Sequence, residues 1–265
     1  MSLKNKLNGL KEIWYFDNRW QLLFSRLFFR HERINIYRLK GMNILVDHLA
    51  GDANGAREII VSPMYRQFLP QMKLDSPVNV LDIGANNGGF PLMLRANDIE
   101  LKKVVSVEFN PNTFGRMRFN LERNAGCEFI GINAAICGEA REIEVRLGEG
   151  SVGDSIYAAN VESSGAHLYH LNGMTFDEIY SSTFGEEKVD ICKIDVEGAE
   201  YEIFNTPHHD RVTRCRYLII EIHEEQGRNP NDVVRRLSEL EFVEQPPVQM
   251  VEPAVHFFVN SALVR

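Results

Sequence analysis

The most informative stretch of the sequence is Val78-Asn79-Val80-Leu81-Asp82-Ile83-Gly84-Ala85-Asn86-Asn87-Gly88-Gly89-Phe90. Its first six residues are mostly apolar and favour a buried strand, a turn of small residues follows, and residues 91–95 have helical character. Strand, glycine turn and helix in this order are typical of a crevice that binds a nucleotide at the carboxyl end of a parallel strand. Glycines let the backbone approach a ligand closely, and the helix start offers free N–H donors.

The spacing of the glycines separates two classes of nucleotide-binding protein. A dinucleotide fingerprint has glycines at its first, third and sixth positions, and Asn86 occupies the third position here. A nucleotide-dependent oxidoreductase therefore loses support but stays an alternative. The Asp-x-Gly-x-Asn-x-Gly pattern instead resembles motif I of the class I methyltransferases that use S-adenosylmethionine, although an ordinary tight turn would also fit. The cofactor-binding interpretation assigns this role to Asp82, Gly84, Asn86 and Gly88.

Length and composition indicate an ordinary globular enzyme. The 265 residues are 44% hydrophobic and 25% charged, which fits one large α/β domain with an N-terminal appendage. The net charge of −8 does not favour a nucleic-acid partner. The four cysteines form no CxxC pair, so we expect reduced thiols and a cytoplasmic protein. We expect neither a signal peptide nor a membrane span, because residues 1–13 lack an apolar core segment and no apolar run reaches the ~18 residues that a span needs.

Residues 1–75 are expected to form an N-terminal helix and β-hairpin cap. Residues 13–30 are aromatic-rich and helical in character, and they carry three arginines. We favour a helix that packs on its own domain or on a second subunit, and peripheral membrane contact is the alternative. Residues 34–39 and 43–47 alternate like a hairpin, and Ser62 with Pro63 indicates a helix start.

From residue 78 onward, strands and helices alternate, which predicts a doubly wound, mostly parallel sheet in a domain of residues 76–265. Residues 139–180 interrupt the alternation with two further strands, near 142–146 and 167–171. This insertion could shape a substrate pocket or be an edge elaboration. The predicted helices cover residues 88–97, 112–124 and 230–240, with another starting near 198. The predicted strands cover residues 78–83, 103–108, 128–133, 189–195, 217–223 and 255–263.

Polar residues follow several of these strands, where open α/β sheets bind ligands. Glu108 can accept both hydroxyls of a ribose, or it can serve as a charge at the start of the helix that begins with Pro111. Asn133 and Ala134 can line an adenine, and a simple turn is the alternative.

The run Lys193-Ile194-Asp195-Val196-Glu197-Gly198-Ala199-Glu200 is a second cluster. A charged lysine within an apolar strand needs a partner, and strand alternation puts Lys193 and Asp195 on one face. Glu221 and His223 likewise share a face of the next strand. We expect these groups to converge at the pocket mouth, with a purely stabilising ion network as the alternative.

Five segments together resemble the FkbM-type methyltransferases over roughly residues 58–225: residues 82–88, 108–111, 133–135, 193–200 and 221–223. The resemblance implies a Rossmann-like class I methyltransferase fold with a seven-stranded sheet and S-adenosylmethionine as cofactor. It also implies O-methylation of a hydroxyl on a sugar, glycan or secondary-metabolite acceptor. A non-catalytic nucleoside-binding interaction module remains an alternative function.

An alcohol is a poor nucleophile until a base withdraws its proton. We assign this role to His223, with Asp195 aligning the acceptor or sharing the base role and also contacting the cofactor. Lys193, Glu197 and Glu221 are the expected substrate-binding residues. His223 could instead be a structural residue at a strand end. Asp195, Glu221 and His223 also resemble the divalent-metal site of catechol-type O-methyltransferases, which we hold below the metal-free hypothesis. The sequence leaves the oligomeric state open.

Overall fold

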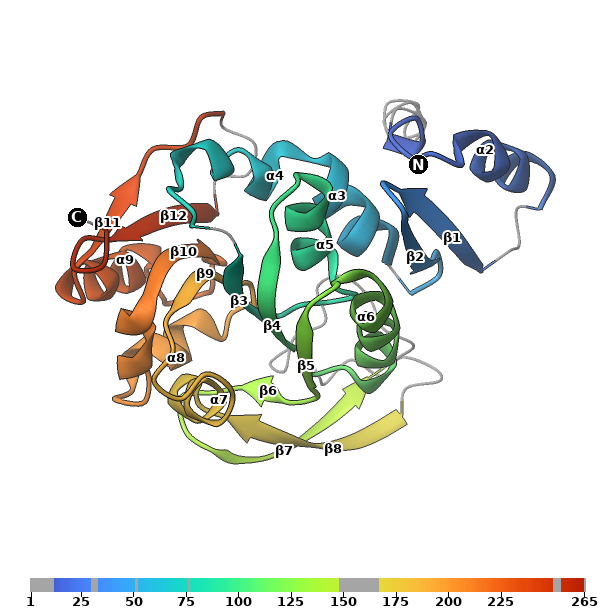
Figure 1. Cartoon of the computed structure of the whole chain (residues 1–265). Helices are drawn as coiled ribbons and strands as arrows, with labels where there is room; N and C mark the ends of the chain where they lie inside the picture. Colours follow the sequence, from blue (N-terminus) through green and yellow to red (C-terminus); the bar gives the residue numbers. More distant parts are fainter. Residues whose placement is uncertain are drawn as a thin grey trace.

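A seven-stranded sheet forms the centre of the computed structural model, which describes residues 12–29, 33–50, 52–75, 77–147, 167–249 and 254–264 (Figure 1). The spatial order is β11-β12-β10-β9-β3-β4-β5, and only β12 runs antiparallel to its neighbours. The strands are β3 (Val78–Ile83), β4 (Leu101–Val107), β5 (Glu128–Ile132), β9 (Val189–Ile194), β10 (Cys215–Glu221), β11 (Phe242–Gln245) and β12 (Val255–Asn260).

This order confirms the predicted class I methyltransferase fold. In chain order the strands of the sheet lie 3-2-1-4-5-7-6, which is the doubly wound dinucleotide-binding order with one antiparallel strand added between the fifth and sixth. The direction of winding reverses between β3 and β9. A sheet of this kind binds ligands beyond the carboxyl ends of the strands at that reversal, so the fold itself locates the site.

Both faces of the sheet are covered, which explains why its strands read as continuous apolar runs. Val78 and Val80 of β3 face one hydrophobic core, and Leu81 and Ile83 face the other. The helices are α5 (Gly89–Ala96), α6 (Pro111–Asn124), α7 (Phe176–Thr183), α8 (Glu200–Asn205) and α9 (Pro230–Glu239).

The helix starts follow the capping residues in the sequence. Asn110 accepts hydrogen bonds from two backbone amides of α6. At α9 the cap is Asn229, whose side chain accepts a hydrogen bond from the backbone amide of Asn231. Thr175 and Glu178 form a reciprocal capping box at α7. Helix α7 begins within residues 139–180, for which the sequence predicts an insertion with two strands and no helix.

A separate three-stranded sheet lies along one edge of the molecule, at the bottom of Figure 1. Its order is β6-β8-β7, from β6 (Ala135–Ile136), β7 (Arg141–Leu147) and β8 (His167–Met174). The strands expected near residues 142–146 and 167–171 are therefore present and longer than predicted. The turn-rich residues 148–155 lie outside the described residues.

The N-terminal elements lie beside α5 and α6. They are α2 (Arg19–Phe28), the confirmed hairpin of β1 (Ile34–Leu39) and β2 (Met42–Asp47), and four short helical segments: η1 (Ala53–Glu58), α3 (Ile59–Val61), α4 (Pro63–Arg66) and η2 (Leu69–Gln71). The helix expected over residues 13–30 is shorter, because a turn precedes Arg19. Ser62 caps α4 as predicted.

Side-chain amides fasten the hairpin to α6. Asn120 both donates to the carbonyl of Leu45 and accepts from its amide, and Asn124 does the same with Asn43.

All four cysteines are free thiols. Among the described residues, the helices are too short or too polar for one to cross a membrane.

Candidate active site

A cavity of about 250 Å³ opens beyond the carboxyl ends of β3, β4, β9 and β10. The N-terminal segment closes one side of it through Gly55, Glu58, Met64 and Tyr65. The lining also includes eight of the predicted site residues: Gly84, Asn86, Glu108, Ala134, Lys193, Asp195, Glu197 and Glu221.

The glycine turn brings the ends of β3 and β9 into contact. Gly84 has a φ of +75°, and a Cβ atom there would lie 1.7 Å from the carbonyl oxygen of Asp195. A side chain at this position would therefore separate the two strands. Asn86 is also in the left-handed region, with a φ of +48°. Gly88, at +88°, precedes α5 and does not line the cavity.

Glu108 is buried at the end of β4, and both of its carboxylate oxygens accept backbone hydrogen bonds. One bond comes from Asn86 at 2.9 Å and the other from Asn110 at 2.8 Å. Glu108 thus supports the start of α6 and also lines the cavity, and its ribose role stays a prediction. Asn133 lies behind this loop, and its amide donates to the carbonyl oxygens of Glu108 and Phe109. The adjacent Ala134 lines the cavity.

Lys193 has the partners that its place in an apolar strand requires. Its Nζ donates to the carbonyl oxygen of Gly84 at 2.7 Å, and it lies 3.3 Å from Asp195 and 3.5 Å from Asp82. Asp82 is fully buried beneath the cavity rather than in its lining. Burial raises the pKa of Asp82 to about 6, although the charge of Lys193 opposes this rise. Asp82 therefore acts as a buried counter-ion in this structure.

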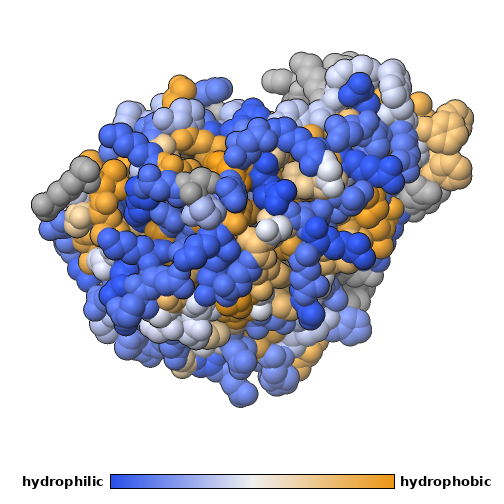
Figure 2. All heavy atoms as spheres, in the orientation of Figure 1, coloured by the Kyte–Doolittle hydropathy of each residue, from blue (hydrophilic) through white to orange (hydrophobic). Residues whose placement is uncertain are grey.

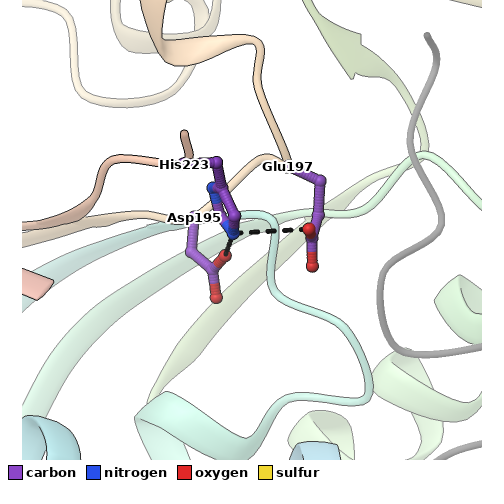
Figure 3. Close-up of side chains that lie close together, drawn as sticks. All are labelled: Asp195, Glu197 and His223. Carbon is purple, nitrogen blue, oxygen red and sulfur yellow. Dashed lines mark ion pairs between the residues drawn. The ribbon is translucent and has the colours of Figure 1, made fainter. Parts of the chain in front are cut away.

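His223 follows β10 and lies among four carboxylates. Its Nδ1 is 2.9 Å from Glu200, and its Nε2 is 3.3 Å from Glu197, 3.7 Å from Glu221 and 4.0 Å from Asp195. Figure 3 shows the Nε2 atom between Asp195 and Glu197. The expected convergence of these strand ends is thus present. His223 does not itself line the cavity, but the three carboxylates nearest to Nε2 do.

The carboxylates control the protonation of His223. Burial alone would lower its pKa, but the hydrogen bond to Glu200 and the charges of Glu200, Glu197 and Asp195 raise the pKa to about 9. The imidazole is therefore protonated at neutral pH in this structure. Burial and the nearby charge of Asp195 raise the pKa of Glu221 to about 7.

Two residues of this cluster were given no role from the sequence. Tyr65, from α4, is fully buried, and its hydroxyl lies 3.0 Å from Asp195 and 3.2 Å from Glu221. Nothing in the sequence near Tyr65 distinguishes it from a core residue. Glu200 is also buried and accepts backbone hydrogen bonds from Val196 and Gly198. Its position within the 193–200 motif was the available signal.

One group in the cluster has the geometry of a metal site. Asp195, Glu197 and His223 each offer one ligand atom, and these atoms lie within 4.8 Å of one another. Glu197 thus takes the position that the sequence analysis gave to Glu221. A carboxylate that holds the other ring nitrogen of a histidine, as Glu200 does, is common around metal-binding histidines.

The sequence matches the family model described as "Methyltransferase FkbM domain" over residues 82–244. Among solved structures, methyltransferase FkbM from Methylobacillus flagellatus KT has a TM-score of 0.48 and 11% identity, covering 72% of this chain and 45% of that chain. Fibrillarin from Aeropyrum pernix, with bound S-adenosyl-L-methionine, has a TM-score of 0.45 and 13% identity, covering 86% and 93%. TYW2 from M. jannaschii, in complex with AdoMet, has a TM-score of 0.42 and 13% identity, covering 86% and 84%.

Likenesses at these identities concern the fold alone, and this chain spans less than half the length of the Methylobacillus protein. No curated protein matches the sequence. The family match stands independently of the structural likenesses and includes more than half of the chain, from the glycine turn through the cluster around His223 to β11. The chain therefore belongs to the FkbM methyltransferase family.

Proposed function

We propose that this protein is an S-adenosylmethionine-dependent O-methyltransferase that acts on a hydroxyl of a sugar, glycan or secondary metabolite. The observation that carries the proposal is the contact of His223 with three carboxylates of the cavity lining: Asp195, Glu197 and Glu221. The cluster joins a titratable base to a cavity with a glycine turn at its edge. A glycan or small-molecule acceptor fits the chain's net negative charge better than a nucleic acid does.

The residues of the cavity fit S-adenosylmethionine. Gly84 lets the ends of β3 and β9 meet at the edge of the cavity, and Asn86 lines the cavity beside it. Glu108 can still accept ribose hydroxyls because each carboxylate oxygen has two lone pairs. The cofactor supplies a methyl group on a positively charged sulfur. The cluster offers a complementary charge, because its carboxylates outnumber Lys193 and His223: Asp82, Asp195, Glu197, Glu200 and Glu221.

The base role of His223 requires its neutral form. Glu200 holds Nδ1, so loss of the proton leaves the lone pair on Nε2, which is directed toward Asp195 and Glu197. Since the carboxylates raise the pKa of His223 to about 9, the neutral form becomes dominant only at alkaline pH. We therefore expect kcat/KM to rise with pH toward about 9. A flat profile between neutral pH and pH 9 would argue against this base.

Replacement of the base gives the direct test. We expect His223→Ala to lower kcat by about 10²–10⁴-fold while calorimetry shows cofactor affinity retained. His256→Ala is the matched control, because His256 also pairs with a glutamate, Glu244, but lies on β12 outside the cavity lining. Unchanged turnover in His223→Ala would remove His223 from the mechanism. The acceptor can be found by mass spectrometry of glycans and metabolites from cells with and without the protein, as a mass gain of one methylene.

Metal-assisted O-methylation is a second candidate, supported by the group of Asp195, Glu197 and His223. These residues would hold a divalent cation that lowers the pKa of an acceptor hydroxyl. The expected result is that exhaustive chelation abolishes turnover, that added Mg²⁺ or Mn²⁺ restores it, and that Glu197→Gln weakens Mn²⁺ binding. Glu244→Gln serves as the control. Turnover that survives chelation would exclude this mechanism.

A non-catalytic nucleoside-binding module and an oxidoreductase remain separable by calorimetry. We expect binding of S-adenosylmethionine and none of NAD, and retained cofactor without methyl transfer to any hydroxylated acceptor would favour the module. We further propose that residues 1–75 act as a cap on a catalytic domain of residues 76–265, since Gly55, Met64 and Tyr65 line the cavity. The free cysteines support a cytoplasmic location.

A further inference from the structure

Helix α2 and the residues that flank it carry six large apolar side chains that are each more than half exposed to solvent. The exposed fractions are 54% for Trp14, 67% for Trp20, 56% for Phe24, 63% for Leu27, 68% for Phe28 and 52% for Phe29. We call these six residues the aromatic surface. Figure 2 shows apolar side chains gathered at the right-hand edge of the molecule, where Figure 1 draws α2. Contiguous apolar patches of this kind mark sites that bind proteins or membranes.

The exposed face of α2 is distinct from the face that packs on the protein. Trp20, Phe24, Leu27 and Phe28 follow the spacing i, i+4, i+7, i+8, which places them on one side of a helix. Leu22, on the opposite side, is buried in the core shared with the hairpin. Folding of the chain therefore uses one face of α2 and leaves the other exposed to solvent, where its rings meet one another, as Phe24 meets Phe28.

The body of the protein holds this surface in a fixed orientation. The side chain of Asn18 accepts from the amide of Arg38 at 2.9 Å and donates to the carbonyl of Ile36 at 2.8 Å. Phe16 is fully buried and meets Tyr37 edge-on, with 4.8 Å between the ring centroids. The aromatic side chains are thus presented by a docked helix rather than by a loose terminus.

Positive charge accompanies the aromatic surface. Arg26 is exposed on α2, and the guanidinium of Arg19 lies 5.6 Å from the ring centroid of Trp14. Residues 1–40 contain nine Lys or Arg and three Asp or Glu, whereas the whole chain has a net charge of −8. The sequence around α2 is therefore basic while the remainder of the chain is acidic.

We propose that the aromatic surface binds an anionic lipid bilayer, with α2 lying in the plane of the interface. Trp, Phe and Leu on one helix face with arginines beside them is the pattern of interfacial helices, whose binding combines apolar burial with attraction to anionic headgroups. A second copy of this chain is a poorer occupant, because two-fold pairing through this surface would bring two basic segments together. The inference does not depend on the proposed methyl transfer.

The two tryptophans of the chain make a direct test, because Trp14 and Trp20 both belong to the aromatic surface. The full chain is mixed with vesicles of phosphatidylcholine alone or with phosphatidylglycerol added. We expect the anionic vesicles to shift tryptophan emission to shorter wavelength and to carry the protein upward in flotation. Phosphatidylcholine alone should bind much more weakly, and added salt should weaken binding to the anionic vesicles.

The double variant Phe24→Glu/Phe28→Glu should lower the partition coefficient by about a hundredfold, because two buried rings are lost and two charges are introduced. Its circular dichroism should be unchanged, since neither side chain contributes to the core. Val243→Glu/Val248→Glu is the matched control, because both valines are exposed away from α2, and it should bind normally. The proposal is overturned by absence of the emission shift with anionic vesicles. It is equally overturned by normal binding of the α2 variant, or by self-association of the wild-type chain that this variant abolishes without any vesicle binding.

Discussion

Two buried charge clusters differ in how their charges are balanced. Arg116 of α6 and Asp52 of the N-terminal segment form a one-to-one pair, with Nε–Oδ2 at 2.7 Å and Nη2–Oδ1 at 2.9 Å. The guanidinium also donates to Asn112 and Thr113. In the cluster around His223, five carboxylates face two cationic side chains.

The difference separates a contact that stabilises the fold from a cluster that we propose to be functional. The Arg116–Asp52 pair has bidentate geometry, so it fastens the N-terminal segment to α6 and has no charge left for a ligand. The His223 cluster keeps an excess of negative charge at a cavity, and several of its pKa values are raised: those of Asp82, Glu197, Glu221 and His223. Perturbed groups at a cavity are typical of functional sites, and the family match agrees with this interpretation.

The largest expected effect comes from loss of Lys193, the buried cation of the His223 cluster. Lys193→Met should lower the free energy of unfolding by about 3–5 kcal/mol, because Asp82 and Asp195 lose their shared counter-ion. Urea unfolding should show a smaller loss at pH 5 than at pH 8, since Asp82 can take up a proton at the lower pH. Lys102→Met, at an exposed pair with Glu187, should change little. Equal losses at the two pH values would contradict this account of Asp82.

Breaking the Arg116–Asp52 pair should lower the free energy of unfolding by less than loss of Lys193 does, and it should not alter the His223 cluster. Asp52→Asn removes the charge opposite Arg116, and we expect a loss of about 2–3 kcal/mol in unfolding free energy from the charged hydrogen bonds. The NMR titration of His223 should stay near pH 9. Asp98→Asn, at an exposed pair, is the control. A shift in the His223 titration would show that the two clusters are coupled.

The His223 cluster should also make the free energy of unfolding depend on pH. The folded protein raises the pKa of His223 from 6.5 to about 9, so its contribution is fully present below pH 6.5 and is lost as pH rises through about 9. The raised pKa values of Asp82 (about 6) and Glu221 (about 7) act in the same direction, because their ionisation is disfavoured in the fold. In the wild type the free energy of unfolding should therefore fall between pH 6.5 and about pH 9. In His223→Gln this fall should be smaller by on the order of 2 kcal/mol.

Urea unfolding of the wild type and His223→Gln at a series of pH values measures this effect. Glu200→Gln tests the cause of the raised pKa, because Glu200 makes the largest contribution that raises the pKa of His223. In that variant the NMR titration of His223 should move toward its ordinary value. Parallel stability curves for wild type and His223→Gln would show that His223 does not carry the pH dependence.

The smallest expected effect is at Tyr65, through which the N-terminal segment contacts the His223 cluster. Tyr65→Phe removes a hydroxyl within hydrogen-bond distance of Asp195 and Glu221, which should cost about 1 kcal/mol of unfolding free energy. Because this hydrogen bond lowers the pKa of Glu221, the variant should raise that pKa further. Infrared titration of the carboxyl groups measures the change. Tyr37→Phe, in the hairpin, should leave the Glu221 titration unaltered.

Much of the fold could be predicted because local patterns and burial agree along the sheet. Strand β3 matches its predicted bounds, 78–83, since a strand buried on both faces and ended by Gly84 leaves little ambiguity. The short β6 and β11 were not predicted, because strands of two and four residues carry too little periodicity. The convergence of Lys193, Asp195 and His223 was predictable from alternation on neighbouring parallel strands.

For some polar residues, the choice between a ligand-binding role and a structural role could be made only from the folded structure. The amide of Asn133 could have faced a ligand, but in the structure it holds the backbone at Glu108 and Phe109. Asp82 lies in the glycine motif, yet it faces Lys193 below the cavity. In both cases the residue type is compatible with either role, and only its neighbours distinguish them.

Most strands of the sheet, the glycine turn and the family can be read from the amino-acid sequence, because these follow from short-range periodicity and from residues close together in the chain. The long-range partners of each charged group depend on how the chain packs. Tyr65 reaches Asp195 and Glu221 across 130 and 156 positions, and α2 exposes one face while burying the other. Protonation and exposure depend on what surrounds a side chain in space, and that is settled when the strands and the N-terminal segment pack together.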